Sequence, residues 1–241
     1  QIPPSIFTDF TRESRNIIVV SKSTKDSAFI NSDKFASPQK ILYINGKTNK
    51  SLVDQINKTA RKAINTFKAN EIKEKQKRIK NSILKTKEFD SLGIRLTMSS
   101  GYKLFKKETV NKLWFQRETQ KGSVNILAYI LPYSSANPSL EQIISIRDSI
   151  GKAFVPGRNK DSYLITEEAY MPYFFKTKIN SLTAFETRGT WELVNDYMAV
   201  PFLNYFIKDK KNNRKIVLEG FVFSPSVRKR VYLVEIEAII R

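Results

Sequence analysis

The chain has 241 residues and contains neither histidine nor cysteine, which excludes disulfide bonds, histidine-based acid–base catalysis and metal sites built on these ligands. Its formal net charge of +19 makes the surface attractive to acidic proteins, nucleic acids and anionic lipid headgroups. Hydrophobic residues form 41% of the chain and include 16 Phe and 10 Tyr. This composition excludes a disordered chain, and no apolar run approaches the roughly 20 residues of a membrane-spanning helix.

The first third of the chain predicts two short strands and one long helix. β-Branched residues dominate 16–20 and 41–45, as is typical of buried strands, and the polar stretch between them is expected to be a loop. A helix is expected over about 51–87, where Ser51 and Asp54 resemble a capping box. Its apolar face follows a spacing of three and four residues: Leu52, Ile56, Ala60, Ala63 and Phe67. The second, lysine-rich half is expected to project from the body or to pack along a narrow seam.

The remaining residues show the same order of elements twice. The predicted strands of the first half are residues 93–100, 112–118 and 123–132. A helix over 139–154 follows, and Ser139 with Gln142 forms its capping box. The predicted strands of the second half are residues 182–193, 202–209 and 215–225. A helix over 226–240 comes last, although this segment also alternates like a strand.

These elements predict an α+β protein with two antiparallel sheets, each covered by helices, and one long basic helix. Two ferredoxin-like halves of strand-strand-strand-helix order are the first guess at the topology. We expect an N-terminal lobe over residues 1–138, which holds the long helix (about 51–87) and the first sheet. A C-terminal lobe over 139–241 is expected to hold the helix over 139–154, the second sheet and the last helix.

The sequence offers no motif for a cofactor or a metal ion. Its 8 glycines form neither a dinucleotide-binding nor a phosphate-binding loop, and no Asp-rich loop of the EF-hand kind is present. We therefore expect no cofactor, no metal site and no catalytic residue.

The segment 184–193 alternates between polar and apolar residues, as a half-buried strand does. Glu186, Arg188 and Glu192 then share one face, and Trp191 lies on the other. The favoured interpretation is an ion-pair ladder over a tryptophan core. A small polar recognition patch is the second interpretation. Acid–base catalysis by Glu186, Glu192 or Asp196 is the third, because two carboxylates can suffice for glycoside hydrolysis.

Two arginines outside this strand have structural interpretations. Arg147 falls in the apolar stripe of the helix over 139–154, so its guanidinium is expected to be paired at the seam between helix and sheet. Arg158 lies in a loop over 155–162. Loops carry function more often than cores do, but a simple turn is the favoured interpretation here.

Basic residues cluster in the long helix, where Lys73, Lys77 and Arg78 lie within two helical turns. They surround the helix and do not form one stripe. A nucleic-acid-binding protein usually lines one face with basic residues, often with stacking aromatics, and here the aromatic residues lie in predicted strands away from these lysines. The pattern therefore disfavours nucleic-acid binding.

Several phrases in the second half resemble a known family. They are RDSIGKAFVPG (147–157), SYLITEE (162–168), TRGTWEL (187–193), DYMAVPF (196–202) and LEGFVFSP (218–225). Together they resemble the domain-of-unknown-function 4837 family of Bacteroidota lipoproteins, and the opening IPPSIF…RESRNIIVV fits the middle of that family. The resemblance covers most of the chain and is strongest in its C-terminal part. No single phrase is specific, but the ordered set is.

The resemblance implies a lipid-anchored envelope protein, with a signal peptide and a lipidated cysteine ahead of a further N-terminal segment. By this resemblance the chain is an ectodomain truncated from a longer protein, and no activity is implied. One departure concerns the position before Pro-Phe, where the family tends to have paired glycines and this chain has Ala199 and Val200. A backbone that needs positive φ would be strained there, which puts in doubt a close ligand cradle at this turn.

Together these observations predict a non-enzymatic ectodomain of an outer-membrane lipoprotein, which binds another protein of the cell envelope as an accessory subunit. The first alternative is a carboxylate-based hydrolase or a binding protein for cell-wall or surface glycan, and the second is a nucleic-acid-binding protein. The candidate partner-binding residues are Glu186, Arg188, Glu192, Asp196, Arg158, Lys73, Lys77 and Arg78.

Overall fold

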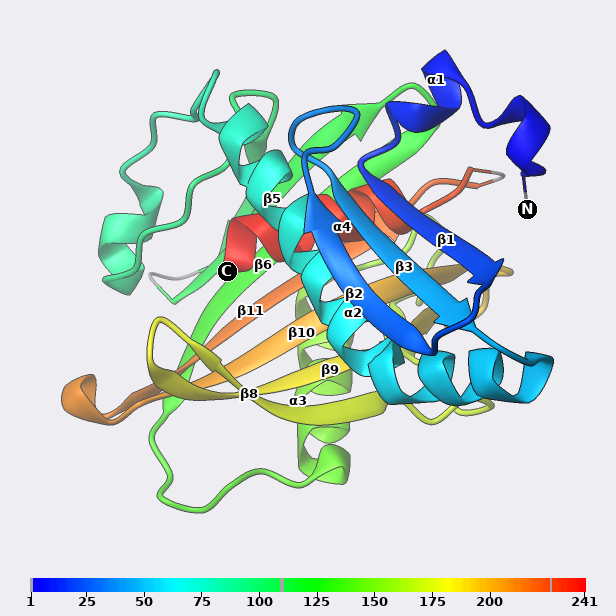
Figure 1. Cartoon of the computed structure of the whole chain (residues 1–241). Coiled ribbons are helices and arrows are strands. Elements are labelled where there is room, and N and C mark those ends of the chain that lie inside the picture. Colours follow the sequence, from blue (N-terminus) through cyan, green and yellow to red (C-terminus); the bar gives the residue numbers. More distant parts are fainter. Residues whose placement is uncertain (1, 109–110, 226) are drawn as a thin grey trace. The chain divides into compact units, whose positions relative to one another are not determined.

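Figure 1 shows the computed structural model of the chain, which describes residues 2–108, 111–225 and 227–241. The chain forms two compact units that divide between Lys77 and Arg78. Each unit has its own sheet, with three strands in the first unit and eight in the second. The predicted α+β class, with two sheets and one long helix, is confirmed.

The first unit is a small mixed sheet with a long helix. Its elements are η1 (Pro4–Ile6), α1 (Asp9–Arg12), β1 (Asn16–Lys22), β2 (Ser27–Ser32), β3 (Lys40–Gly46) and α2 (Asn49–Ile79). β1 pairs with β3 in parallel and β2 pairs with β3 antiparallel, so the strand order is β1-β3-β2. This sheet is therefore mixed, with one parallel and one antiparallel strand pair. α2 runs along one face of the three strands (Figure 1).

The predicted apolar stripe of the long helix is confirmed at three of its five residues, whereas Ile56 is 40% exposed. Leu52, Ala63 and Phe67 of α2 share one hydrophobic cluster with Leu42 and Ile44 of β3. Residues three and four apart lie on the same side of a helix, and alternate residues lie on the same side of a strand. The cluster therefore forms where these two periodic faces meet.

Three details of the first unit differ from the sequence-based expectation. Residues 27–32 form β2 where a loop was expected, and Ile30 of this strand packs against the cluster below α2. α2 ends at Ile79, well before residue 87. Its start is capped by Thr48 and Ser51, because each backbone N–H donates to the other residue's hydroxyl oxygen at 3.0 and 3.1 Å. The capping pair is thus shifted by three residues from the expected one.

The second unit is an antiparallel sheet with one helix on each face. Its strands are β4 (Lys103–Glu108), β5 (Lys112–Thr119), β6 (Gly122–Pro132), β7 (Leu164–Thr166), β8 (Tyr173–Ile179), β9 (Leu182–Leu193), β10 (Ala199–Asp209) and β11 (Arg214–Phe223). Its helices are η2 (Glu88–Leu92), α3 (Leu140–Phe154), η3 (Lys210–Asn212) and α4 (Arg230–Ile240). The strand order is β4-β5-β6-β11-β10-β9-β7, and β8 also pairs with β9.

One strand pair joins the two predicted strand triplets into a single sheet. β6 pairs with β11 over ten residues, from Ser123 opposite Phe223 to Pro132 opposite Arg214. Most residues of both strands are buried, so each strand needs a neighbour for its backbone groups. The lobe boundary expected after residue 138 and the two ferredoxin-like halves are therefore not observed. Each triplet instead runs as a meander, and the two meanders meet at their last strands.

Some boundaries in the second unit also differ from the expected ones. Residues 93–100 were predicted as a strand, but the outer strand of the sheet is β4, which begins at Lys103. β7 and β8 were not predicted. The last helix is confirmed over Arg230–Ile240, and residue 226, where it was expected to begin, lies outside the described residues.

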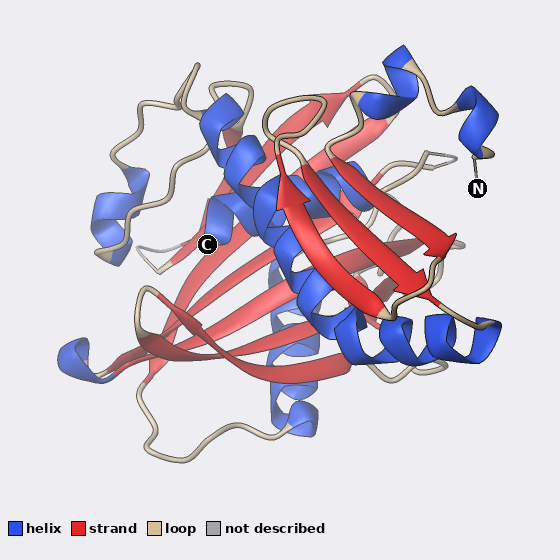
Figure 2. Ribbon diagram, in the orientation of Figure 1, coloured by secondary structure: helices blue, strands red, loops and turns tan. Residues whose placement is uncertain are grey.

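The two faces of the large sheet are covered by different helices (Figure 2). α3 packs over the apolar residues of β9, β10 and β11, which we call the α3 face, and α4 packs on the opposite face, the α4 face. Trp191 and Phe221 stack on the α3 face with ring centroids 5.3 Å apart. The predicted capping box of α3 is confirmed, because Ser139 and Gln142 exchange hydrogen bonds of 3.1 and 3.2 Å.

Candidate functional site

Two of the predicted site residues belong to a network of charges on the α4 face. Glu186 and Arg188 project from β9, and Arg188 donates to Glu186 and, at 2.7 Å, to Glu237 of α4. Arg241, which follows α4, donates to Glu186 and Glu237, both at 2.8 Å. Each carboxylate therefore accepts from both guanidinium groups. The predicted ion pairing along β9 is confirmed for this pair, although the helix supplies half of the network.

The two carboxylates of this network converge on one hydroxyl. Tyr205 of β10 donates to Glu186 at 2.9 Å and lies 3.2 Å from Glu237. Burial, followed by the charges of Glu237 and Glu186, raises the pKa of Tyr205 far above its ordinary value. The side chains of Glu186 and Glu237 are only 7% and 3% exposed. Both carboxylates are therefore buried and hydrogen-bonded to the two arginines and to Tyr205.

The other predicted residues of this segment lie apart from the network. Asp196 follows β9 and accepts from Arg158 at 2.8 and 3.1 Å, and this hydrogen bond lowers the pKa of Asp196 below its ordinary value. Glu192 lies opposite Ala199 and six residues beyond Glu186, which is about 20 Å along a strand. The structure thus joins Arg158 to Asp196 and Arg188 to Glu186, but it does not join these pairs into one site.

The three basic candidates of the long helix lie in its last two turns. Lys73 and Lys77 are exposed on α2, one helical turn apart, and Arg78 is the first residue of the second unit. On the same helix, Glu71 accepts from Arg15 at 3.0 and 2.8 Å and from Asn16 at 2.6 Å. These contacts tie the second half of α2 to the start of β1, so this half packs within its unit and does not project freely.

A buried ion pair on the α3 face was predicted only in part. Arg147 of α3 donates to both carboxylate oxygens of Glu219 at 2.8 and 2.9 Å, and both side chains are 1% exposed. The guanidinium carbon lies 3.3 Å from the ring centre of Phe202 and 4.7 Å from that of Trp191. The predicted pairing of Arg147 at the seam is confirmed. Glu219 was not predicted as its partner. The sequence does indicate it, because in LEGFVF (218–223) this glutamate shares one side of the strand with Phe221 and Phe223.

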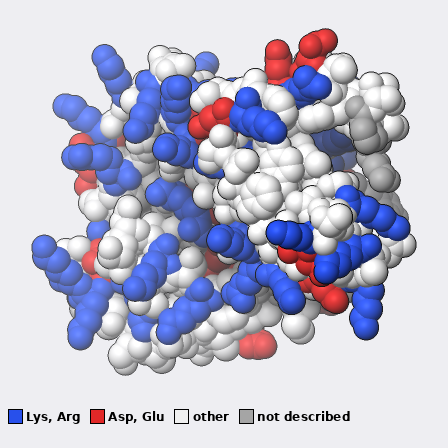
Figure 3. Space-filling model, in the orientation of Figure 1, with Lys and Arg blue, Asp and Glu red and all other residues white. Residues whose placement is uncertain are grey.

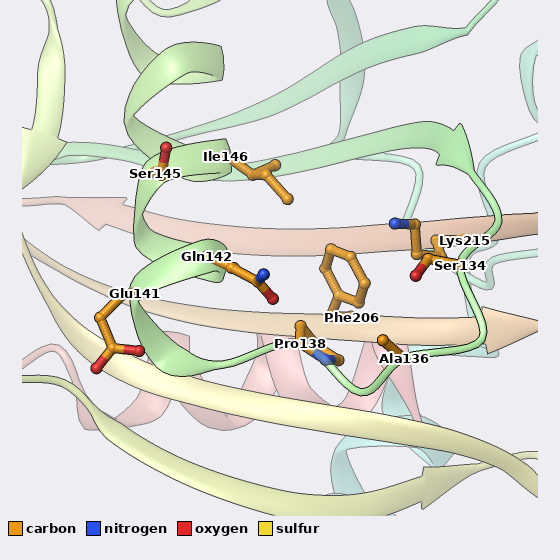
Figure 4. Close-up of a pocket in the computed structure, with 9 residues that line it drawn as sticks. All are labelled: Ser134, Ala136, Pro138, Glu141, Gln142, Ser145, Ile146, Phe206 and Lys215. Carbon is orange, nitrogen blue, oxygen red and sulfur yellow. The ribbon is translucent and has the colours of Figure 1, made fainter.

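A shallow pocket of about 500 Å³ lies beside the start of α3 (Figure 4). Phe206 and Ile146 form its apolar lining, and the ammonium group of Lys215 lies 5.4 Å from the ring centre of Phe206. The loop that forms one wall is held by Lys208, which donates to the carbonyl oxygens of Ser135 and Ala136 at 2.6 and 3.3 Å. Glu141 is the single carboxylate in this lining. The lining thus holds one carboxylate, whereas most glycoside hydrolases use a pair.

The largest unpredicted feature is a row of exposed aromatic residues at the sheet edge. Four large side chains in or just before β8 are strongly exposed, and we call them the aromatic edge: Tyr170 (71%), Met171 (79%), Tyr173 (72%) and Phe175 (49%). The rings of Tyr173 and Phe175 lie nearly parallel, with centroids 6.4 Å apart. The signal that could have found this surface is YMPYFF (170–175), in which four of six residues are aromatic.

The described residues contain neither a cluster of metal ligands nor a membrane-spanning helix. Among the described residues, no group of three or more acidic residues is placed to hold a metal ion. Within the same part of the chain, no helix is both long enough and apolar enough to cross a lipid bilayer.

Comparison with known proteins identifies the family. Residues 80–241 match the family described as Domain of unknown function (DUF4837). The chain belongs to this family. Residues 1–80 match a second family, Domain of unknown function (DUF8532), so the DUF4837 match begins close to the division between the two compact units. The predicted family is thereby confirmed, while the lipoprotein character and the bacterial group remain predictions.

Other comparisons add little to the DUF4837 assignment. No curated protein matches the chain. Among solved structures, LpqN of Mycobacterium tuberculosis, described as involved in cell envelope biogenesis, is 9% identical with a TM-score of 0.34, over 61% of this chain and 78% of that one. A mutant of the protein Mog1 is also 9% identical with a TM-score of 0.34, over 60% of this chain and 82% of that one. At such scores the likeness carries no argument about this chain.

Proposed function

We propose that the chain is a non-enzymatic binding module of the cell envelope, which holds an acidic partner protein at the aromatic edge of its large sheet. In this proposal the full-length protein is an outer-membrane lipoprotein, and its N-terminal lipid keeps the module at the membrane. The module acts as an accessory subunit through surface complementarity and requires no cofactor.

The aromatic edge is the observation that carries this proposal. Single exposed hydrophobic residues are common on soluble proteins, whereas contiguous exposed apolar patches mark interaction sites. Aromatic residues and Met are also enriched at protein–protein interfaces. Tyr170, Met171, Tyr173 and Phe175 are close in sequence, aromatic or sulfur-containing, and strongly exposed, and the rings of Tyr173 and Phe175 lie side by side.

Charge around the edge supports an acidic partner. Lys176 and Lys178 belong to β8 and are exposed. The face drawn in Figure 3 carries many more basic than acidic side chains, in keeping with the net charge of +19. Such a surface speeds the encounter with an acidic protein and disfavours basic partners.

The state of the candidate carboxylates supports a role without catalysis. Glu186 and Glu237 are each held by two arginines and a tyrosine, and Asp196 is held by Arg158. Acid–base catalysis needs a group that can reach the proton it transfers. These three carboxylates instead complete internal contacts.

A glycan-binding module is the second candidate function, and one observation favours it. The nearly parallel, exposed rings of Tyr173 and Phe175 offer flat apolar surfaces on which a sugar ring can lie. An acidic protein is preferred because Lys176 and Lys178 of the same strand are exposed on its other face, and a neutral glycan gains nothing from them. Binding to purified cell-wall or surface glycan, measured beside the protein capture described below, separates the two candidates.

The proposal predicts that removal of the two stacked rings abolishes partner capture. The chain and its Tyr173→Ser/Phe175→Ser variant are used as baits in a detergent extract of the native envelope, and the captured proteins are identified by mass spectrometry. We expect one acidic protein to be recovered in stoichiometric amount with the unaltered chain and at least about tenfold less with the variant, because interface aromatic residues contribute most to affinity. Recovery should also fall as salt is raised.

The matched control is a Phe10→Ser/Tyr197→Ser variant. It removes one Phe and one Tyr that are also strongly exposed, at 84% and 106%, but lie outside the aromatic edge. This variant should capture the partner as the unaltered chain does. Equal capture by all three baits, or capture of no acidic protein by any of them, would contradict the proposed function.

A further inference from the structure

β8 has a free edge along its whole length. In the part of the chain that the structure describes, its seven residues pair only with β9. The backbone groups on the other side of β8 therefore have no strand partner. Such an edge is a template for the addition of another strand, and this inference about how the partner binds rests on the proposed function.

The turn that follows β8 shows which backbone groups face outward. Asn180 and Ser181 link Ile179 to Leu182 and both have positive φ, 46° and 70°, as in a type I′ turn. The hydrogen bond of such a turn joins the residues on either side of it, so Ile179 and Leu182 form a hydrogen-bonded pair. Hydrogen-bonded and non-hydrogen-bonded pairs then alternate along an antiparallel ladder.

Because of this alternation, the backbone groups of β8 fall into two sets, one that points toward β9 and one that points away from the sheet. Tyr173, Phe175 and Thr177 have the same parity as Ile179, so their N–H and C=O groups point toward β9. The intervening residues point their N–H and C=O groups away from the sheet: Phe174, Lys176 and Lys178. An incoming strand would pair with this second set.

The two faces of β8 differ in chemistry. Tyr173 and Phe175 lie opposite Arg188 and Glu186 and so share the α4 face, where their rings are exposed. Lys176 lies opposite Phe185 on the α3 face, and Lys178 shares that side because alternate residues do. β8 thus presents rings on one side and ammonium groups on the other.

Phe174 anchors the strand between these surfaces. Its ring stacks on that of Phe185 with centroids 5.7 Å apart and planes 10° apart, and it packs against the core of the α3 face. β8 is therefore held in place before any partner arrives. A preformed edge avoids part of the entropy cost of ordering an interface.

We propose that the acidic partner binds by adding an extended segment to the free edge of β8 as a further strand. Its side chains alternate between the two faces, as those of any strand do. Acidic residues on the α3 face then meet Lys176 and Lys178, and apolar residues on the α4 face then meet Tyr173 and Phe175. The recognised segment is therefore one in which acidic and apolar residues alternate.

A second copy of this chain is a poorer occupant of the same edge. Antiparallel pairing of two β8 strands would bring the lysines of one copy beside those of the other, and like charges on neighbouring strands are destabilising. Each copy also carries a net charge of +19. Lysines on edge strands commonly prevent self-association. At this edge they also select an acidic segment.

Amide hydrogen exchange of the full chain tests the proposal directly. The probe is a short capped peptide of alternating glutamate and valine, and the readout is the exchange rate of single amides by NMR. Strand addition predicts slowed exchange at Phe174, Lys176 and Lys178, at least about tenfold at saturation, and unchanged exchange at Phe175 and Thr177. Two peptides serve as controls: one alternates lysine and valine, and the other has all its glutamates in a single block. Both should leave the exchange rates of all β8 amides unchanged.

A result that lacks this alternation would overturn the inference. If the peptide binds and shifts the side-chain signals of Tyr173 and Phe175 but leaves the three outward amides unprotected, docking is by side chains alone. Absence of binding by the alternating acidic peptide, at concentrations where the partner itself is captured, would overturn it as well.

A proline variant separates this inference from the proposed function. Lys176→Pro removes an outward N–H and places a ring at the free edge, a position where proline is tolerated, and Lys176→Ala removes only the charge. We expect partner capture to fall at least about tenfold with Lys176→Pro and by less with Lys176→Ala. Unchanged capture by a folded Lys176→Pro protein would refute strand addition while leaving the proposed function intact, provided that Tyr173→Ser/Phe175→Ser still loses the partner.

Discussion

At the scale of single residues, a buried ion pair joins α3 to the large sheet. Arg147 and Glu219 are 72 positions apart in the sequence and meet between α3 and β11 with almost no solvent exposure. Glu219 also accepts from Asn204 at 2.7 Å, and Arg147 donates to Thr166 at 2.6 Å. A buried ion pair is tolerated only when such additional hydrogen bonds satisfy the remaining polar atoms.

Removal of one partner of this pair should be strongly destabilising. Arg147→Met leaves Glu219 buried without its cation, and Glu219→Gln leaves Arg147 without its anion. We expect each change to lower the free energy of unfolding by about 3–5 kcal/mol. Urea unfolding followed by tryptophan fluorescence measures this unit alone, because both tryptophans of the chain, Trp114 and Trp191, lie in its core.

The double variant Arg147→Met/Glu219→Leu is the control for this prediction. It replaces both charges by apolar side chains, so neither charge is left buried and unpaired. We expect it to be more stable than either single variant. Single variants within about 1 kcal/mol of the unaltered chain would show that the pair is dispensable.

Asp209 predicts a pH dependence of stability. Burial raises the pKa of this carboxyl, but hydrogen bonds from Asn212 and Arg214 outweigh burial and leave the pKa below its ordinary value. A group whose pKa is lowered by folding contributes stability above its unfolded pKa, about 3.9 for Asp, and loses it as pH falls through the folded value. Stability should therefore drop below about pH 4, and less so in Asp209→Asn.

Urea unfolding at a series of acidic pH values measures this difference. Glu168→Gln is a suitable control, because it removes one carboxylate charge at an exposed position of the same unit. Its stability should follow the unaltered chain as the pH is lowered. An Asp209→Asn protein with the same acid dependence as the unaltered chain would contradict the assignment.

At the scale of elements, α3 is positioned by a close approach of two backbones. A Cβ atom at Gly151 of α3 would lie 1.9 Å from the carbonyl oxygen of Leu164 in β7. Only glycine allows the helix to come this near to the strand. This close contact fixes the distance between α3 and the sheet. Arg147 lies one turn earlier in the helix, and at this distance its guanidinium group contacts Glu219.

Gly151→Ala should therefore destabilise the second unit, although alanine favours a helix more than glycine does. Overpacking against a backbone atom costs typically about 1–3 kcal/mol. The matched control is Ser149→Ala, which also adds helix propensity but at an exposed position of α3. Urea unfolding followed by tryptophan fluorescence should show a loss for the first variant and no loss for the second. A Gly151→Ala protein as stable as the control would contradict the close approach.

Elements with a strong local pattern could be predicted from the sequence. The capping box at Ser139 and the apolar stripes of α2 and α3 depend on residues a few positions apart. The capping box and the α3 stripe are confirmed, and the α2 stripe is confirmed at three of its five residues. β2, β7 and β8 escaped prediction. β7 has only three residues, and β8 exposes two of its four apolar side chains, so neither shows the alternation by which a strand is recognised.

At the scale of the whole molecule, the charge is shared by both units. Each unit contains more basic than acidic residues, so an acidic partner is attracted to the chain as a whole before it reaches a particular surface. Long-range attraction does not define where the partner binds. In the proposed function the partner binds at the aromatic edge, where exposed apolar side chains and a free backbone edge occur together.

The α+β class, the family, the long helix, the capped helix and the pairing of Arg147 at the seam could all be predicted from the amino-acid sequence, because each depends on periodicity, on local capping or on a set of phrases. Three features became visible only in the folded chain: the two strand triplets form one sheet, Glu237 and Arg241 complete the network of Glu186 and Arg188, and β8 is left with a free edge. These features depend on which strands become neighbours. The pairing of strands depends on contacts between residues far apart in the chain, so a local sequence pattern does not predict which strands become neighbours.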